Sequence, residues 1–144
     1  KINFWQWADF LSVPMALAYG LGRISCLLAG CCYGKACEWP WAISLSWDQH
    51  YVLRHPTQIY ALIWELSVWL LLLQIERKKA EQKWNPGMLF SIWIILHGAG
   101  RLIMEYFRDD FRGQIFLSLT ISSWISLSLI VVGFSILQKK SNRT

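Results

Sequence analysis

Arginines inside apolar segments are the residues of this sequence best suited to chemistry. Arg23 lies in the apolar run 8–29, and Arg101 lies in the apolar run 87–104. A guanidinium group at the centre of a bilayer costs at least about 2.5–3.5 kcal/mol, so each arginine should face a protein interior or a wet cavity with an anionic partner. Because the guanidinium fork matches phosphate, we expect a phospholipid head group or another anion to bind between Arg23 and Arg101.

A polar stripe follows the second of these arginines. The segment HGAGRLIMEYFR places His97, Arg101, Glu105 and Arg108 at i, i+4, i+8 and i+11, which is one face of a helix. The stripe could line a binding site. It could also be an internal ladder of ion pairs, Arg101 with Glu105 and Arg108 with Glu105 or Asp109, that only holds helices together.

Glycines and a histidine lie near the other arginine. The segment GLGRISCLLAGCCYGK has glycines at 20, 22, 30 and 34, which indicate either a packing face of small residues or backbone N–H groups open to an anion. In RHPTQIY, Pro56 resembles a helix start and His55 precedes it, either as a solvated residue or as a base.

The elements that must position these residues are membrane helices. The 144 residues are 55% hydrophobic and include ten tryptophans, and the mean hydropathy is +0.33. Four runs approach the roughly 20 residues that cross a bilayer; they are 8–29, 58–75, 87–104 and 115–137. We therefore predict an all-α integral membrane bundle of about four helices, forming one domain over 1–144.

The basic residues predict the orientation of this bundle. The net charge is +5, but the positive residues cluster beside apolar runs, so we expect no nucleic-acid partner. The loop after the second run and the C-terminal tail should be cytoplasmic, which leaves 30–57 and 105–114 outside. These two basic segments contain Arg77, Lys78, Lys79 and Lys83, and Lys139, Lys140 and Arg143.

The four cysteines, at 26, 31, 32 and 37, do not have the spacing of a zinc ribbon or a ferredoxin, so we expect no metal ion. Three alternatives remain for them. Cys37 could form a disulfide with Cys31 or Cys32, the thiols could be reduced packing residues, or one could be a catalytic or lipid-carrying thiol. Glu65, within the second run, could pair with an arginine or be a packing acid.

Three segments together resemble the prolipoprotein diacylglyceryl transferase family. In order and spacing, GRISCLLAGCCYGK, RHPTQIY and HGAGRLIMEYFR are similar to the family patterns GRIGNFINGExxGR, RHPSQLYE and YGxxRFxxEFxR. The resemblance also includes Asp9 and the segment GQIFLSL, which resembles the opening of the family's last helix. It covers the family's C-terminal part, and the family's N-terminal half has no counterpart in this sequence.

The resemblance implies a bacterial inner-membrane enzyme that transfers diacylglycerol from phosphatidylglycerol to the lipobox cysteine of a prolipoprotein. It requires cations for the departing phosphate and a base for the thiol, and no cofactor. We assign catalysis to four residues, Arg23, Arg101, His97 and His55. The resemblance implies six substrate-binding positions, which are Gly22, Gly34, Gln58, Tyr60, Glu105 and Arg108.

The sequence departs from the family pattern at four positions. Cys26 replaces an asparagine, Cys31 a glutamate, His97 a tyrosine and Ala61 a glutamate. His97 could therefore handle a proton that the tyrosine does not, or only hydrogen-bond a neighbouring helix. Two alternative functions remain open: transfer from the same donor to another acceptor, and a non-catalytic membrane subunit of a larger complex that keeps a bound lipid.

Overall fold

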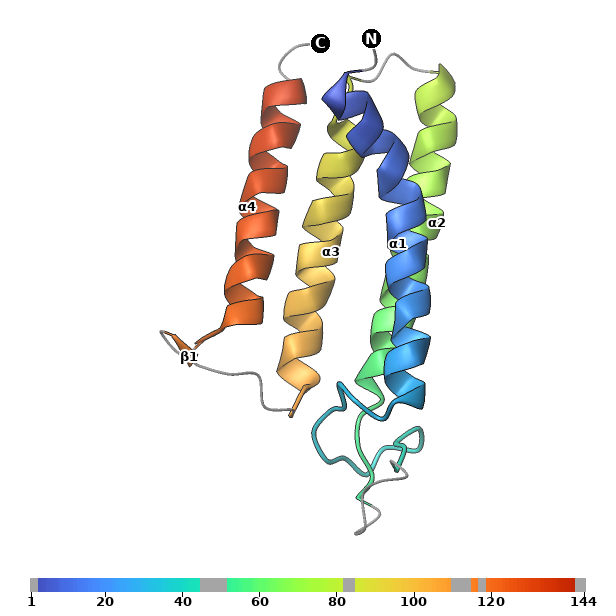
Figure 1. Cartoon of the computed structure of the whole chain (residues 1–144), viewed down its shortest axis with the longest axis vertical. Helices are drawn as coiled ribbons and strands as arrows, with labels where there is room; N and C mark the ends of the chain where they lie inside the picture. The colour runs from blue at the N-terminus through green and yellow to red at the C-terminus, as the bar shows by residue number, and fades with distance from the viewer. Residues whose placement is uncertain (1–2, 45–51, 82–84, 110–114, 117–118, 142–144) are drawn as a thin grey trace.

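Four long helices make up most of the protein (Figure 1). The computed structural model describes residues 3–44, 52–81, 85–109, 115–116 and 119–141. The helices are α1 (Phe4–Leu28), α2 (Thr57–Glu81), α3 (Met88–Phe107) and α4 (Ile121–Ser141). All four are long and apolar enough to cross a membrane, which confirms the predicted all-α bundle.

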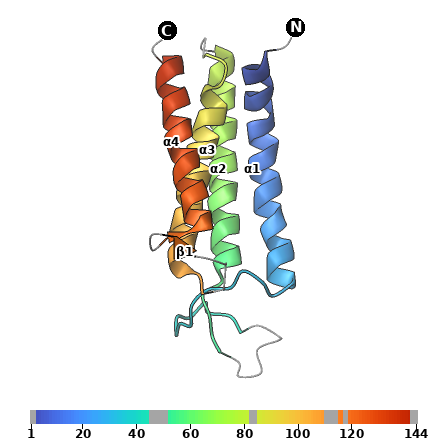
Figure 2. The same ribbon diagram turned by 60° about the vertical axis from the view of Figure 1, so that its left-hand side comes forward.

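The helices run alternately up and down (Figures 1 and 2). Helix α3 packs against the other three, most extensively against α4, while α1 and α2 pack against each other. Both chain ends lie at one end of the bundle, which we call the terminal end. Residues 31–44 and 52–54 lie beyond the helices at the opposite end, which we call the loop end (Figure 1).

The fourth predicted span begins too early. Residues 115–120 include a short antiparallel hairpin, β1 (Ile115–Phe116) with β2 (Leu119–Thr120), and α4 begins only at Ile121. The Thr120 hydroxyl accepts a hydrogen bond from the Ser123 N–H at 3.2 Å, which is the role of an N-cap residue. Helix α2, by contrast, continues past residue 75 to Glu81, because Glu, Arg and Lys are good helix formers.

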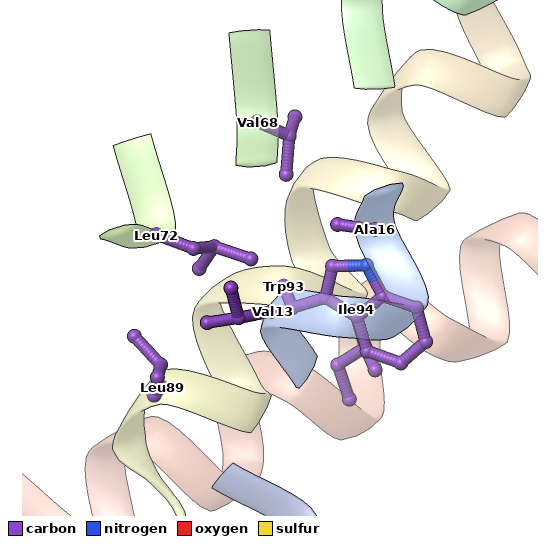
Figure 3. Packing of buried hydrophobic residues seen from close by; sticks show 7 residues of the cluster. All are labelled: Val13, Ala16, Val68, Leu72, Leu89, Trp93 and Ile94. Carbon is purple, nitrogen blue, oxygen red and sulfur yellow. The ribbon is translucent and has the colours of Figure 1, made fainter. Parts of the chain in front are cut away.

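The hydrophobic core lies in the half of the bundle near the terminal end. Its buried side chains come from α1, α2 and α3 (Figure 3), and they are Val13, Ala16, Val68, Leu72, Leu89, Trp93 and Ile94. Asp9 of α1 anchors this half, because its carboxylate accepts hydrogen bonds from the N–H groups of Gly87 and Phe90, both at 2.9 Å. A carboxylate there satisfies the free donors at the N-terminus of α3 and complements its dipole.

Close helix contacts depend on glycine. A Cβ atom at Gly100 would lie 2.1 Å from Nε1 of Trp64, and one at Gly98 would lie 2.8 Å from the carbonyl oxygen of Ser126. These glycines let α3 approach α2 on one side and α4 on the other, as small residues commonly do in membrane bundles.

The basic residues at the helix ends lie on one side of the bundle. Arg77 and Lys78 lie near the end of α2, and Lys139 and Lys140 lie near the end of α4. Both helices end at the terminal end (Figure 1). Lys83 and Arg143 lie outside the described residues, as do parts of 30–57 and 105–114. Which side of a membrane the terminal end faces stays a prediction.

Candidate functional site

A polar pocket lies between α1, α2 and α3 in the half of the bundle near the loop end. Its free volume is about 10 Å³, which is room for about one water molecule. Five of the ten predicted site residues line it: Arg23, Arg101, Gln58, Glu105 and Arg108. Its other lining residues are Tyr19, Cys32, Thr57, Ala61, Trp64, Glu65, Gly100 and Met104.

The two arginines meet at one phenol oxygen. Nη2 of Arg23 donates a hydrogen bond to the Tyr19 hydroxyl, and Nη1 of Arg101 donates to the same oxygen at 2.9 Å. The guanidinium of Arg23 also lies 4.5 Å from the centre of the Tyr19 ring. Tyr19 is therefore a neutral bridge between two cations that come from different helices.

These cations have no carboxylate partner within the described residues. The remaining hydrogen bond of Arg101 goes from Nη2 to the Ser122 hydroxyl at 2.6 Å, and Nε of Arg23 is buried without a partner. The pair of Arg101 with Glu105, part of the ion-pair ladder that was one alternative, is not found there; Glu105 accepts a hydrogen bond from Thr120 at 2.7 Å. Asp109 pairs with Arg54 at 3.3 Å. Because two guanidinium groups converge on a hydroxyl and neither is bonded to a carboxylate among the described residues, this part of the site is suited to an anion.

A carboxylate and an imidazole form a second polar pair beside the arginines. Nδ1 of His97 lies 2.7 Å from Oε1 of Glu65, whose other oxygen is buried without a partner. Glu65 is 2% exposed and lines the pocket, whereas His97 is not among the lining residues. The Tyr19 and His97 rings are nearly perpendicular, with 4.4 Å between their centroids. His97 therefore hydrogen-bonds a neighbouring helix and holds Glu65 at the pocket.

The start of α2 fixes the loop that follows α1. Thr57 donates from its hydroxyl to the carbonyl oxygen of Cys32 at 2.5 Å, and Nε2 of Gln58 donates to the carbonyl oxygen of Cys31 at 2.6 Å. Oε1 of Gln58 is buried without a partner. Gln58 thus joins the pocket wall to the cysteine segment and keeps an acceptor free.

His55 and Tyr60 belong to a different cluster at the loop end. Nδ1 of His55 lies 3.1 Å from the Tyr60 hydroxyl, which also accepts a hydrogen bond from Nε1 of Trp41 at 2.7 Å. The His55 ring packs against Phe107 with 5.4 Å between centroids. Neither His55 nor Tyr60 is among the residues that line the pocket.

The two predicted glycines have different surroundings. A Cβ atom at Gly34 would lie 2.6 Å from both Cβ and the carbonyl oxygen of His55, so Gly34 allows the loop to pack closely. Gly22 is exposed, and a Cβ atom there would meet nothing within 4 Å. Neither glycine lines the pocket, so the structure does not bring all ten predicted residues together.

None of the four cysteines, all of which lie within the described residues, is in a disulfide, so the structure does not contain the one from Cys37 that was one alternative. Cys37 is held elsewhere, because its N–H donates to the Leu53 carbonyl at 2.9 Å. Loss of hydration, together with the neighbouring sulfurs of Cys32 and Cys26, raises the pKa of Cys31 to about 11. Cys31 is thus a thiol at neutral pH, which disfavours it as a nucleophile.

The predicted site left out Tyr19, Glu65 and Ser122, of which the sequence had marked only Glu65. Tyr19 precedes Arg23 by four residues and so lies on the same helix face. An acidic residue in the middle of an apolar run marked Glu65, but its partner could not be chosen without the helix packing. Ser122 had no signal, because serine is common along α4.

The sequence of the chain matches a known protein family. The family model described as prolipoprotein diacylglyceryl transferase matches residues 1–138. A phosphatidylglycerol–prolipoprotein diacylglyceryl transferase of Clostridium tetani is 40% identical over 128 residues, covering 87% of this chain and 49% of that protein.

Two other relatives have the same kind of name. Phosphatidylglycerol–prolipoprotein diacylglyceryl transferase 2 of Clostridium perfringens is 36% identical, over 92% of this chain and 51% of the relative. The corresponding transferase of Campylobacter lari is 33% identical, over 91% of this chain and 46% of the relative. The chain spans about half the length of the curated relatives it matches.

Proposed function

The chain belongs to the prolipoprotein diacylglyceryl transferase family, and we propose that it binds phosphatidylglycerol and takes part in transferring its diacylglyceryl group to a prolipoprotein cysteine. The names of the relatives give the donor and the acceptor. The observation that carries the proposal is the meeting of Arg23 and Arg101 at the Tyr19 hydroxyl. Two cations without a carboxylate partner among the described residues form a receptor for the lipid phosphate.

The arginines act on the leaving group. The substrate's cysteine sulfur forms a bond to a glycerol carbon of the lipid, and the bond from that carbon to the phosphate oxygen breaks. Glycerol phosphate departs with the bonding electrons, so negative charge grows on the phosphate. Guanidinium groups held on two separate helices are already oriented toward this charge, which makes their stabilisation effective in a partly dehydrated pocket.

A base must take the proton of the substrate thiol. Within the described pocket, we assign this role to Glu65, whose Oε2 atom is buried and without a partner. His97 would act as a positioning residue, since it holds Oε1 of the same carboxylate at 2.7 Å. His55 stays the alternative base, although it belongs to the cluster with Tyr60.

Binding of the head group requires Tyr19 to move. The present pocket has room for about 10 Å³, and the Tyr19 oxygen occupies the position where the two guanidinium groups converge. A phosphate offers more acceptor oxygens than a phenol and carries charge, so it should displace this hydroxyl. Gln58, Glu105 and Arg108 line the space beside it, and they would contact the rest of the head group.

The location of the protein follows from its helices and its relatives. Four helices of membrane-spanning character and relatives from bacteria indicate a bacterial membrane protein. We propose the cytoplasmic membrane, with the loop end outside, because basic residues gather at the terminal end. Labelling of single introduced cysteines in intact cells tests this: residue 36 should react with an impermeant reagent and residue 78 should not.

Transfer is tested with the full-length protein, labelled phosphatidylglycerol and a lipobox peptide. The expected product is a diacylglyceryl thioether on the peptide cysteine. Arg23→Lys and Arg101→Lys should each lower transfer by about 100-fold or more, since lysine keeps the charge but loses the fork. Arg77→Lys, at the exposed end of α2, is the matched control and should leave transfer unchanged.

Two results would count against the proposal. If transfer survives in both arginine variants, the pocket does not take part in the reaction. Lipid binding without any thioether product in the full-length protein would support the non-catalytic membrane subunit instead.

A further inference from the structure

We infer that Cys26, Cys31 and Cys32 form a trithiolate site for a soft, thiophilic metal ion of the class that includes Zn²⁺ and Cu⁺. Their sulfur atoms all lie within 4.8 Å of one another. Cys32 also lines the pocket of the two arginines, but neither arginine is among the proposed ligands, and the test does not depend on transfer activity.

The way in which α1 ends brings the first two sulfurs together. The Cys31 N–H donates to the Cys26 carbonyl at 3.1 Å, and the Gly30 N–H donates to the Leu27 carbonyl at 3.1 Å. With Gly30 at φ 65°, this is a Schellman motif, in which the residue after the glycine contacts the last turn of the helix. That contact is ordinarily apolar, and here it joins two thiols.

The third sulfur depends on an unusual backbone conformation. Cys32 has φ 62°, the left-handed region that non-glycine residues rarely adopt. The surrounding hydrogen bonds hold it there, because Thr57 and Gln58 bind the carbonyl oxygens of Cys32 and Cys31 at 2.5 and 2.6 Å. A left-handed cysteine fixed by side chains of α2 points to a functional role for the thiol's position.

The geometry needs little change to accept an ion. With metal–sulfur bonds of about 2.3 Å, three sulfurs in a plane around an ion lie roughly 4.0 Å apart. The present separations, 4.8 Å or less, are close to this value. Thiolate ligands select soft ions over Mg²⁺ and Ca²⁺, which prefer oxygen. Cys31 is exposed, so an ion can enter and a water molecule can complete the coordination.

The sequence spacing argued against a metal because zinc ribbons place their cysteine pairs two to four residues apart. A helix that ends in a Schellman motif brings residues i and i+5 together. In this chain those residues are Cys26 and Cys31, and the left-handed Cys32 follows directly. The spacing of the three cysteines therefore fits a metal site at the end of a helix.

Binding of the ion should depend on pH. Cysteine ligates a metal as the thiolate, so the ion displaces the protons of the three thiols, which are released to solvent. Metal binding should therefore tighten as the pH rises from 6 to 8.

The test uses the full-length protein in detergent, reduced and then freed of reductant, with Cd²⁺ as the first probe. We expect a single Cd²⁺ per chain, seen as an ultraviolet thiolate-to-metal charge-transfer band, and displacement by Zn²⁺. Cys26→Ser, Cys31→Ser and Cys32→Ser should each weaken binding by about 100-fold or more, because even outer-sphere partners contribute 10–100-fold. Cys37→Ser is the matched control and should change affinity less than about twofold.

A second measurement needs no substitution and so is independent of variant folding. Alkylation of the unmodified protein, followed by mass spectrometry, should show that Zn²⁺ protects Cys26, Cys31 and Cys32 together, while labelling of Cys37 is unchanged. Thr57→Val should weaken binding by roughly tenfold, because it frees the Cys32 carbonyl. Cd²⁺ binding that survives removal of all three cysteines, or equal protection of Cys37, would overturn the inference.

Discussion

The two halves of the bundle treat buried charge in opposite ways. Near the terminal end, both oxygens of Asp9 accept hydrogen bonds from backbone N–H groups of Gly87 and Phe90, and an apolar core lies beside them. Near the loop end, Arg23 and Arg101 share the Tyr19 hydroxyl, and polar atoms of Gln58 and Glu65 are buried without partners among the described residues. The first half is built for stability, and the second leaves groups ready for a ligand.

The largest expected effect separates function from stability at the loop end. The double variant Arg23→Met/Arg101→Met removes both cations, and we expect phosphatidylglycerol transfer to fall by more than about 1,000-fold, since a single lost donor costs 10²–10³. The thermal midpoint should stay equal or rise, because two costly charges leave the bundle. Transfer assays and thermal unfolding in detergent measure the two quantities. A large fall in the midpoint would make the arginines structural.

The reverse pattern is expected at the terminal end. Asp9→Ala removes two charge-assisted hydrogen bonds and exposes donors at the start of α3, which should lower the free energy of unfolding by about 2–4 kcal/mol. Transfer by the protein that stays folded should be close to normal. Asp9→Asn keeps one acceptor oxygen, so its free energy of unfolding should lie between those of the parent and of Asp9→Ala. Glu76→Gln, an exposed acid on α2, is the control. Loss of transfer without loss of stability would contradict the comparison.

Substitutions in the pair of Glu65 and His97 test whether each residue takes part in transfer. Glu65→Gln should lower transfer by about 100-fold or more if the carboxylate takes the thiol proton. His97→Tyr, which restores the family's residue type, should lower it by only about tenfold, since it changes the position of that carboxylate. The pH dependence of transfer should also change shape. A His97→Tyr profile equal to the parent in shape and height would show that His97 only packs.

Sequence reasoning found the arginines but not what lies between them. Arg23 and Arg101 could be found from the sequence because a charged residue in an apolar run is energetically costly and therefore rare. The roles of Tyr19 and Glu65 become visible only once α1 and α2 pack against α3, and the periodicity of the sequence does not predict that packing. The hairpin before α4 was missed because its residues are as apolar as the helix that follows, and only the Thr120 cap separates them.

For the cysteines, the spacing in the sequence was compared with the wrong class of site. Their spacing was judged against metal sites formed by loops, whereas the ending of α1 sets the distances between their sulfurs. His55, Tyr60 and Gly34 were grouped with the arginines by the resemblance, but they pack the loop beyond the pocket. The resemblance therefore identified the family, but it did not separate the residues that line the pocket from those that pack the loop.

The smallest expected effect concerns Gly22, which the resemblance assigned to substrate binding. It lies within α1, is exposed, and has open space where a side chain would be. Gly22→Ala should therefore raise the free energy of unfolding by about 0.5–1 kcal/mol through helix propensity alone. Gly34→Ala is the contrast, because its Cβ atom would clash with His55 and should destabilise the loop end. Both are measured by thermal unfolding in detergent.

Transfer by Gly22→Ala then decides what the open space is for. If the lipid enters the pocket from the other side of α1, the stabilised variant should transfer at the parent rate. If transfer falls while stability rises, the lipid must pass over Gly22 itself, because a single methyl group would obstruct nothing else there. That result would place the entry of the donor on the exposed face of α1, one residue before the arginine that binds its phosphate.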